Sequence, residues 1–170
     1  MICAIGQDSH RFMEPSETCD TNIDKPLLLG GVLFEDAPPL SGNSDADVVL
    51  HALCNAISGI TCVNILGSRA DNMLKERGIV NSEHYVLEAM KYLDRYKIAH
   101  LSFSIECAVP KISPRIEEMR INIARITGVP SEHIGITATS GEALTDFGRG
   151  LGIQVFCMIS CFEMKDDKLI

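Results

Sequence analysis

Four stretches of the chain have the apolar spacing of β-strands. They are residues 2–5, 99–108, 134–139 and 151–162. Residues 99–108 alternate between apolar and polar positions, which is typical of a strand with one buried face. Residues 151–162 are apolar at successive positions, which favours a strand in the interior of the sheet. Two further apolar runs within residues 26–34, on either side of two glycines, predict a hairpin or a bent strand. The polar residues 13–25 before them predict a surface loop.

Apolar positions three or four residues apart predict helices in the rest of the chain. Ser44 stands three residues before Asp47, as in a capping box, and predicts the start of a helix that continues to Gly59. Three further helices are predicted at residues 71–77, 82–96 and 114–127, and Ser82 is expected to cap the second of them. The order of these elements predicts an α+β fold in a single domain over residues 1–170, with one sheet and helices packed on one face.

Composition narrows the classes of function. The chain has 170 residues, a net charge of −8 and no basic run, so we expect no nucleic-acid partner. No apolar run reaches the ~18 residues needed for a membrane span, so we expect no membrane partner. Seven cysteines are dispersed without a C-x-x-C pair, which favours buried or idle thiols in a reducing compartment. The N-terminus lacks a charged leader followed by a long apolar stretch, so a cytoplasmic protein is expected.

Asp8 and His10 provide the first indication of chemistry. They are two residues apart, directly after the apolar run 2–5. A strand points every second side chain to the same face, so a strand continuing to His10 places the two side by side. A carboxylate and an imidazole form a suitable pair of ligands for Zn²⁺, but the pair needs a third ligand.

His51 is the candidate for the third ligand. It lies near the middle of the helix predicted to start at Ser44, among apolar neighbours, where a core histidine bonded to the backbone is the alternative interpretation. Asp47 is one turn back on the same helix face, and its carboxylate either orients the free imidazole nitrogen or is solvated. Two histidines and one aspartate with an open fourth position have the composition of a catalytic zinc site.

Five ordered blocks of sequence carry a resemblance to a known family. They are Gly-x-Asp-x-His-Arg-Phe (6–12), Leu-Leu-Gly-Gly-Val (28–32), Ser-Asp-Ala-Asp-Val-x-Leu-His-Ala-Leu (44–53), Ala-Val-Pro-Lys-Ile-Ser-Pro with Met-Arg (108–114, 119–120), and Ala-Thr-Ser-Gly-Glu with Phe-Gly-Arg-Gly-x-Gly-Ile (138–142, 147–153). In this order and spacing they resemble the 2-C-methyl-D-erythritol 2,4-cyclodiphosphate synthases. This family closes a cyclic diphosphate and releases CMP in the non-mevalonate isoprenoid route.

The resemblance implies a role for each matching residue. Asp8, His10 and His51 correspond to the zinc ligands, and Glu142 to the carboxylate that helps hold a second divalent ion, Mg²⁺ or Mn²⁺. Ser140 matches a hydroxyl that steadies the transferring phosphate. The cytidine pocket of the nucleotide diphosphate substrate corresponds to Ala108, Pro110, Lys111 and Ile112, with Thr139.

The resemblance also implies an assembly. Asn43 and Ser44 occupy the loop that covers the methylerythritol phosphate, and Asn43 and Ser140 are the two side chains expected to act on the transferring phosphate. The family is a homotrimer in which zinc comes from one subunit and the cytidine pocket from the next. Its central cavity holds an isoprenoid diphosphate near the position of Arg149.

The chain departs from the family pattern around the sugar phosphate. Asn43 replaces a histidine and cannot carry its positive charge. Asn64 opens Asn-Ile-Leu (64–66) in place of the Asp-Ile-Gly that touches the ribose, and residues 69–71 replace a Phe-Pro-Asp segment. Leu151 replaces a glutamate. Two alternatives to an active synthase are therefore another zinc-dependent phosphotransferase or phosphodiesterase, and a non-catalytic or altered-substrate paralogue that binds a cytidine nucleotide.

Overall fold

The computed structural model of the protein describes residues 1–14 and 25–164. Most of the loop predicted at 13–25, with Cys19, lies outside the described residues. The helices and strands in chain order are β1 (Ile2–Arg11), β2 (Leu27–Leu29), β3 (Val32–Phe34), α1 (Val48–Thr61), α2 (Ser68–Arg77), α3 (Ser82–Met90), β4 (Tyr96–Glu106), α4 (Ile116–Thr127), β5 (Ile134–Thr139) and β6 (Gly152–Glu163). All the predicted strands are present, and β1 continues past His10 as expected.

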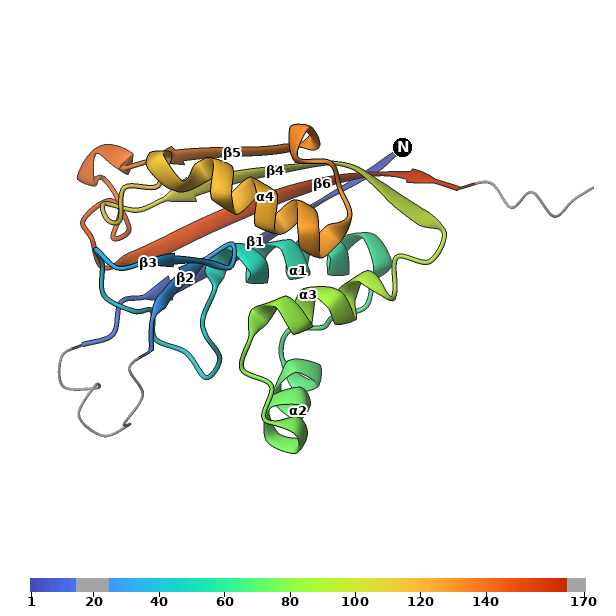
Figure 1. Cartoon of the computed structure of the whole chain (residues 1–170), viewed down its shortest axis with the longest axis horizontal. Helices are drawn as coiled ribbons and strands as arrows, with labels where there is room; N and C mark the ends of the chain where they lie inside the picture. Colours follow the sequence, from blue (N-terminus) through green and yellow to red (C-terminus); the bar gives the residue numbers. More distant parts are fainter. Residues whose placement is uncertain (15–24, 165–170) are drawn as a thin grey trace, which may run out of the picture.

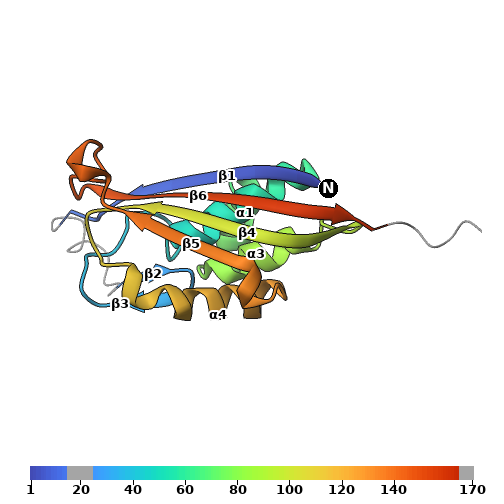
Figure 2. The same ribbon diagram turned by 90° about the horizontal axis from the view of Figure 1, so that it is seen from above.

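The main sheet has four strands in the order β1-β6-β4-β5, so β6 is an interior strand, as predicted. Its pairs are antiparallel except β4 with β5, which run parallel. In Figure 1, α1 and α3 lie beneath the sheet and α2 lies farthest from it. Figure 2 looks onto the opposite face of the sheet, with α1 and α3 behind the strands and α4 along the β5 side. The α+β class and the helices on one face are confirmed.

The expectation of one sheet needs a correction, because β2 and β3 pair only with each other. They form the predicted hairpin, whose turn consists of Gly30 and Gly31 with φ of 60° and 74°. Two successive positive φ values form the type of tight turn that glycine adopts without steric cost. The hairpin packs against α4, where Asn122 donates a hydrogen bond to the Gly30 carbonyl at 2.7 Å.

The predicted start of the first helix was wrong. The residue that caps α1 is Asp47, not Ser44, and its carboxylate accepts hydrogen bonds from the backbone N–H groups of Val49 and Leu50, each at 3.1 Å. The same carboxylate accepts from Gly30 and Gly31 at 2.8 and 2.6 Å. Asp47 is therefore neither solvated nor in place to orient His51. Its buried charge joins the hairpin to the N-terminus of the helix, where a negative group is favoured.

The predicted helices also differ in their other bounds: α2 begins at Ser68 rather than at residue 71, and α4 begins at Ile116 rather than at residue 114. α1 continues past Gly59 to Thr61, because packing against the sheet outweighs the low helix propensity of one glycine. α3 ends at Met90 rather than at residue 96, and its cap is Asn81, which accepts from the Glu83 N–H at 2.8 Å. Ser82 is thus free to bond elsewhere.

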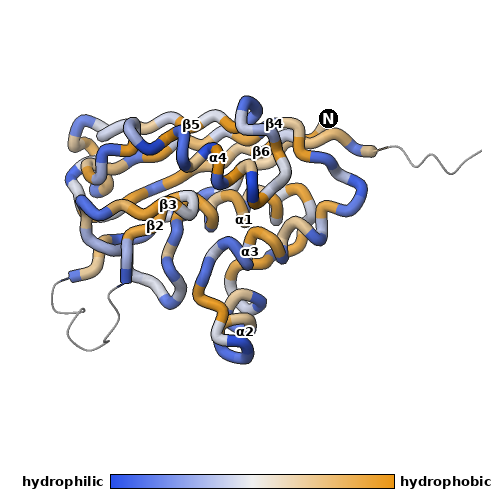
Figure 3. Tube along the Cα trace, in the orientation of Figure 1, coloured by the Kyte–Doolittle hydropathy of each residue, from blue (hydrophilic) through white to orange (hydrophobic). Residues whose placement is uncertain are grey.

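The contact between β1 and α1 is unusually close and sets the position of the site. A side chain on Gly6 of β1 would meet the Ala52 carbonyl and the Ala56 nitrogen, both at 2.2 Å from its Cβ. Gly6, Asp8 and His10 share one face of the strand, so the side chains of Asp8 and His10 point to the side of the sheet that α1 covers. Hydrophobic residues gather along α1 and the strands that it covers (Figure 3), and most side chains of α1 are buried.

The described cysteines are all free; Cys3 and Cys62 are exposed, and the others are buried. Among residues 1–14 and 25–164, the structure contains no helix with the length and apolar character to cross a membrane.

Candidate metal centre

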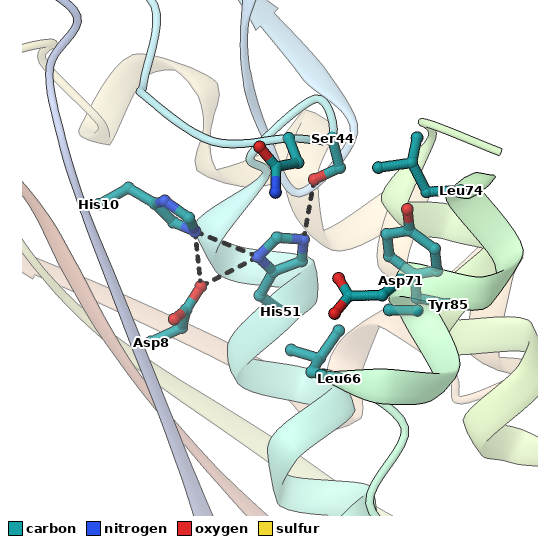
Figure 4. A pocket seen from close by; sticks show the side chains of 11 residues that line it. Asp8, His10, Ser44, His51, Leu66, Asp71, Leu74 and Tyr85 are labelled. Carbon is teal, nitrogen blue, oxygen red and sulfur yellow. Dashed lines mark hydrogen bonds and ion pairs between the residues drawn. The ribbon is translucent and has the colours of Figure 1, made fainter. Parts of the chain in front are cut away.

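Asp8, His10 and His51 converge at one point (Figure 4). The Asp8 Oδ2 atom lies 3.0 Å from His10 Nε2 and 3.0 Å from His51 Nδ1, and the two nitrogens are 3.3 Å apart. Asp8 and His10 come from alternate positions of β1, and His51 comes from the first turn of α1. The structure therefore brings together the three residues that the sequence suggested as metal ligands.

The surroundings of His10 indicate that this point suits a cation. His10 Nδ1 lies 2.7 Å from the Ser41 carbonyl oxygen, which can only accept a hydrogen bond, so the neutral ring carries its proton on Nδ1. Nε2 then directs a lone pair toward Asp8 Oδ2, which also has only lone pairs to offer. Acceptors this close repel one another unless a proton or a metal ion lies between them, so the donor set fits a divalent cation with nitrogen and oxygen ligands.

The contacts among Asp8, His10 and His51 also shift the pKa values of Asp8 and His10. Burial alone would raise the pKa of Asp8, but hydrogen bonds and charge attraction from His10 and His51 outweigh it and hold the pKa well below its usual range. Burial alone would lower the pKa of His10, but the hydrogen bond with Asp8, the negative charge of Asp8 and the hydrogen bond with the Ser41 carbonyl together outweigh the burial and raise the pKa. Without a metal ion, the site is stabilised by a proton shared with a carboxylate.

A dependence on pH follows from these shifts. In the metal-free protein, the raised pKa of His10 contributes stability that is complete below its ordinary value of 6.5 and is lost as pH rises through the raised value. The lowered pKa of Asp8 contributes stability above its ordinary 3.8, lost only in stronger acid. A cation competes with the His10 proton, so we expect the rise in melting temperature caused by Zn²⁺ to grow between about pH 5.5 and about pH 8. Thermal unfolding with Zn²⁺ and with a chelator measures this rise, and equal rises at both pH values would contradict it.

A pocket of about 230 Å³ opens beside the three residues. Asn43 and Ser44 line it, whereas Asn64 is exposed and is not among the lining residues. The side chains of Leu66, Asp71, Leu74 and Tyr85 complete the pocket wall, as Figure 4 shows.

Sequence reasoning did not assign these four residues to the site. Leu66 and Asp71 lie in the segments where the chain departs from the family pattern, and that departure was the available signal for them. Tyr85 follows the apolar stripe of α3 and is buried, so its pattern is that of a core residue. Its hydroxyl donates to the Ile79 carbonyl at 2.8 Å.

The remaining candidate residues form a second cluster at the carboxyl ends of β4 and β5 and in the loop before β6. The Cys107 N–H donates to Thr139 and the Ala108 N–H donates to Phe147, both at 3.1 Å, so the three segments are held together. The cluster contains Ala108, Pro110, Lys111, Ile112, Thr139, Ser140, Glu142 and Arg149. Pro110 and Ile112 are buried and the other members are exposed.

This second cluster does not reach the metal site within one chain. None of its members is among the described residues that line the pocket. His10 pairs with Ile153 on β6, and Glu106 pairs with both Gln154 and Thr139. The metal site and the Thr139 part of the second cluster therefore lie at the same end of the sheet, with β1 at one edge and β5 at the other. Glu142 itself has a φ of 51°, in a left-handed turn that begins at Gly141.

Comparison with known proteins identifies the family. The family model of YgbB matches residues 1–161. The chain is 48% identical to the 2-C-methyl-D-erythritol 2,4-cyclodiphosphate synthase of Chlamydia muridarum over 160 residues, covering 94% of this chain and 86% of the relative. The corresponding synthase of Chlamydia abortus is 46% identical over 160 residues, covering 94% and 88%.

Solved structures share the fold. The bifunctional IspDF of Campylobacter jejuni matches with a TM-score of 0.81 and 25% identity, over 95% of this chain and 42% of that one. The CDP complex of IspF from Plasmodium falciparum matches with a TM-score of 0.77 and 22% identity, over 96% of each chain. The chain belongs to the YgbB family, the 2-C-methyl-D-erythritol 2,4-cyclodiphosphate synthases, as the resemblance in the sequence implied. It is an isoprenoid-pathway enzyme of the cyclodiphosphate synthase type.

Proposed function

We propose that this enzyme converts 4-diphosphocytidyl-2-C-methyl-D-erythritol 2-phosphate to 2-C-methyl-D-erythritol 2,4-cyclodiphosphate and CMP, and is thus a phosphorus–oxygen lyase. In this reaction an oxygen of the 2-phosphate attacks the β-phosphorus, and the bond to the α-phosphate breaks as CMP leaves. The observation that carries the proposal is the convergence of Asp8 Oδ2, His10 Nε2 and His51 Nδ1 beside a pocket.

Asp8, His10 and His51 would hold Zn²⁺ in this proposal. When bound, the ion supplies positive charge where negative charge builds on the transferring phosphate. Asn43 and Ser44 lie in the wall of the same pocket, and their side chains offer hydrogen bonds to the methylerythritol phosphate. The acidic chain lacks a basic run that could take over this role, which makes a cation at the site more necessary.

In this proposal the second cluster binds the cytidine diphosphate part of the substrate. Glu142 would help to hold Mg²⁺ or Mn²⁺, because hard cations prefer carboxylate oxygens. Ser140 would hydrogen-bond the transferring phosphate. The cytidine would occupy the pocket formed by Ala108, Pro110, Lys111, Ile112 and Thr139.

A homotrimer would unite the two clusters. They lie on opposite edges of the sheet, so the metal site of one subunit can meet the nucleotide cluster of its neighbour. The sheet face without helices also exposes large apolar side chains, including Ile5 at 66%, Met158 at 50% and Phe162 at 51%. An apolar surface of this kind favours burial in an interface.

The trimer would enclose a cavity on the side of Arg149, where an isoprenoid diphosphate is the proposed occupant. Arg149 is exposed and pairs with Asp146 at 3.0 Å, so its guanidinium is accessible. Leu151 beside it is 59% exposed and apolar, which suits the hydrocarbon part of such a ligand better than its phosphates. The proposed location is the cytoplasm.

The proposal is tested by incubating the purified protein with the substrate, Zn²⁺ and Mg²⁺. We expect stoichiometric CMP and a cyclic diphosphate in the ³¹P NMR spectrum, and loss of both when a chelator is added. A folded, zinc-loaded trimer that releases no CMP would overturn the proposed activity. If that trimer still binds a cytidine nucleotide, the non-catalytic or altered-substrate paralogue becomes the correct description.

A further inference from the structure

The nitrogen of His51 that faces away from the metal site makes contacts that the proposed function does not use. His51 Nε2 lies 2.9 Å from Ser82 Oγ, and Ser82 is fully buried at the start of α3. Ser82 Oγ also contacts Asp45 Oδ1 closely, and the Ser82 N–H donates to Asp45 Oδ2 at 2.9 Å. Asp45, Ser82 and His51 thus form a continuous hydrogen-bond chain from the loop before α1, through α3, to the metal site.

The donor and the acceptor of each of these hydrogen bonds follow from the Asp45 carboxylate at one end of the series. The Asp45 carboxylate can only accept, so the single proton of the Ser82 hydroxyl is donated to Asp45. Ser82 Oγ is then left as an acceptor toward His51, and Nε2 must carry the ring proton. Nδ1 of the neutral ring is consequently unprotonated and directs its lone pair toward Asp8 and His10.

Ser44 does not reverse this assignment. Its Oγ lies 3.4 Å from His51 Nε2, longer than the 2.9 Å from Ser82. Ser44 Oγ also accepts a hydrogen bond from the Ala46 N–H at 3.1 Å. The shorter contact with the buried Ser82 therefore determines which nitrogen of the His51 ring carries the proton.

We infer that Ser82 and Asp45 are positioning residues that fix the tautomer and orientation of His51, so that Nδ1 is ready to bind a divalent cation. The inference rests on the proposed metal-dependent function and extends it to two residues outside the ligand set. Ligand histidines in metal sites are commonly held in this way by a carboxylate, and loss of such a partner lowers metal affinity about 10- to 100-fold. Here the buried serine separates the carboxylate from the ring.

The test compares Zn²⁺ affinity, by chelator competition, in the wild-type protein and in Ser82→Ala and Asp45→Asn. We expect Ser82→Ala to weaken binding by about 10- to 100-fold. Asp45→Asn should weaken it less, because the amide oxygen still accepts from Ser82. Ser58→Ala is the matched control, since Ser58 is a buried serine of α1 whose hydroxyl has no hydrogen-bond partner. Its Zn²⁺ affinity should equal that of the wild type.

A second readout does not depend on metal binding. Long-range ¹H–¹⁵N NMR of the metal-free wild-type protein at about pH 8 distinguishes the two tautomers of neutral histidine. We expect the proton of His51 on Nε2, and a shift toward a mixture in Ser82→Ala. An Nδ1–H tautomer in the wild type, or Zn²⁺ affinity of Ser82→Ala within twofold of wild type, would overturn the inference alone. Failure of the wild type to bind Zn²⁺ would overturn the proposed function as well.

Discussion

His51→Ala should lose Zn²⁺ binding and, with it, CMP release. The substitution removes the ligand nitrogen from α1 and leaves Asp8 and His10 as a two-residue site on β1. Loss of a direct ligand should exceed the effect of losing a supporting partner, so we expect affinity to fall by more than about 100-fold. Metal content after dialysis and CMP formation under excess substrate measure the two effects.

The matched control for this prediction is His133→Ala. His133 is exposed in a short turn before β5, far along the chain from the site, so removing its imidazole should leave metal content and activity unchanged. The ligand assignment would be wrong if His51→Ala retained one equivalent of zinc. Circular dichroism of His51→Ala should match that of the wild-type protein stripped of metal, which separates loss of the ligand from loss of the fold.

Gly6→Ala should be the most damaging change of a single methyl group in the sheet. The added Cβ would lie 2.2 Å from two backbone atoms of α1, at Ala52 and Ala56, and backbone cannot rotate away as a side chain can. The helix must therefore move off β1, at a cost of about 3 kcal/mol or more in the free energy of unfolding. The same movement separates His51 from Asp8, so zinc affinity should fall together with stability. Urea unfolding and chelator competition measure the two changes.

Gly135→Ala gives the comparison, because it places the same methyl group on another strand. The nearest heavy atom to its Cβ would be His100 Nε2 at 3.8 Å, which is ordinary van der Waals contact. A change within about 0.5 kcal/mol is expected there. Equal stability of the two variants would show that the contact between β1 and α1 is not as rigid as its geometry indicates.

Local patterns predicted much of the fold because they depend on neighbouring residues. The alternation of apolar positions located β4 and β5, and the continuous apolar run placed β6 inside the sheet. Helix ends were harder to predict. Both Ser44 and Ser82 have the residue type of a cap, but Asp47 and Asn81 take that role. Which side chain caps a helix depends on the other hydrogen bonds that each candidate side chain can form. Those other partners are distant in the sequence.

The site shows the same division. Strand periodicity placed Asp8 and His10 side by side, and the position of His51 in a predicted helix made it the candidate third ligand. The family motifs added Glu142 and the other residues of the second cluster. Neither could indicate that the two clusters lie on opposite edges of the sheet, because strand order results from long-range pairing. The placement of Asp71 and Tyr85 in the pocket wall likewise depends on how α2 and α3 pack.

The sequence by itself determined which candidate ligands and family motifs this protein carries, since residue types, motif order and strand spacing depend on the chain alone. Only the tertiary structure decided how that chemistry is assembled. The close approach allowed by Gly6 brings α1 onto β1, Asp47 anchors the helix to the hairpin, and Ser82 reaches His51 from another helix. The physical reason is that each of these contacts joins residues far apart in sequence, and packing selects them only when the whole core forms.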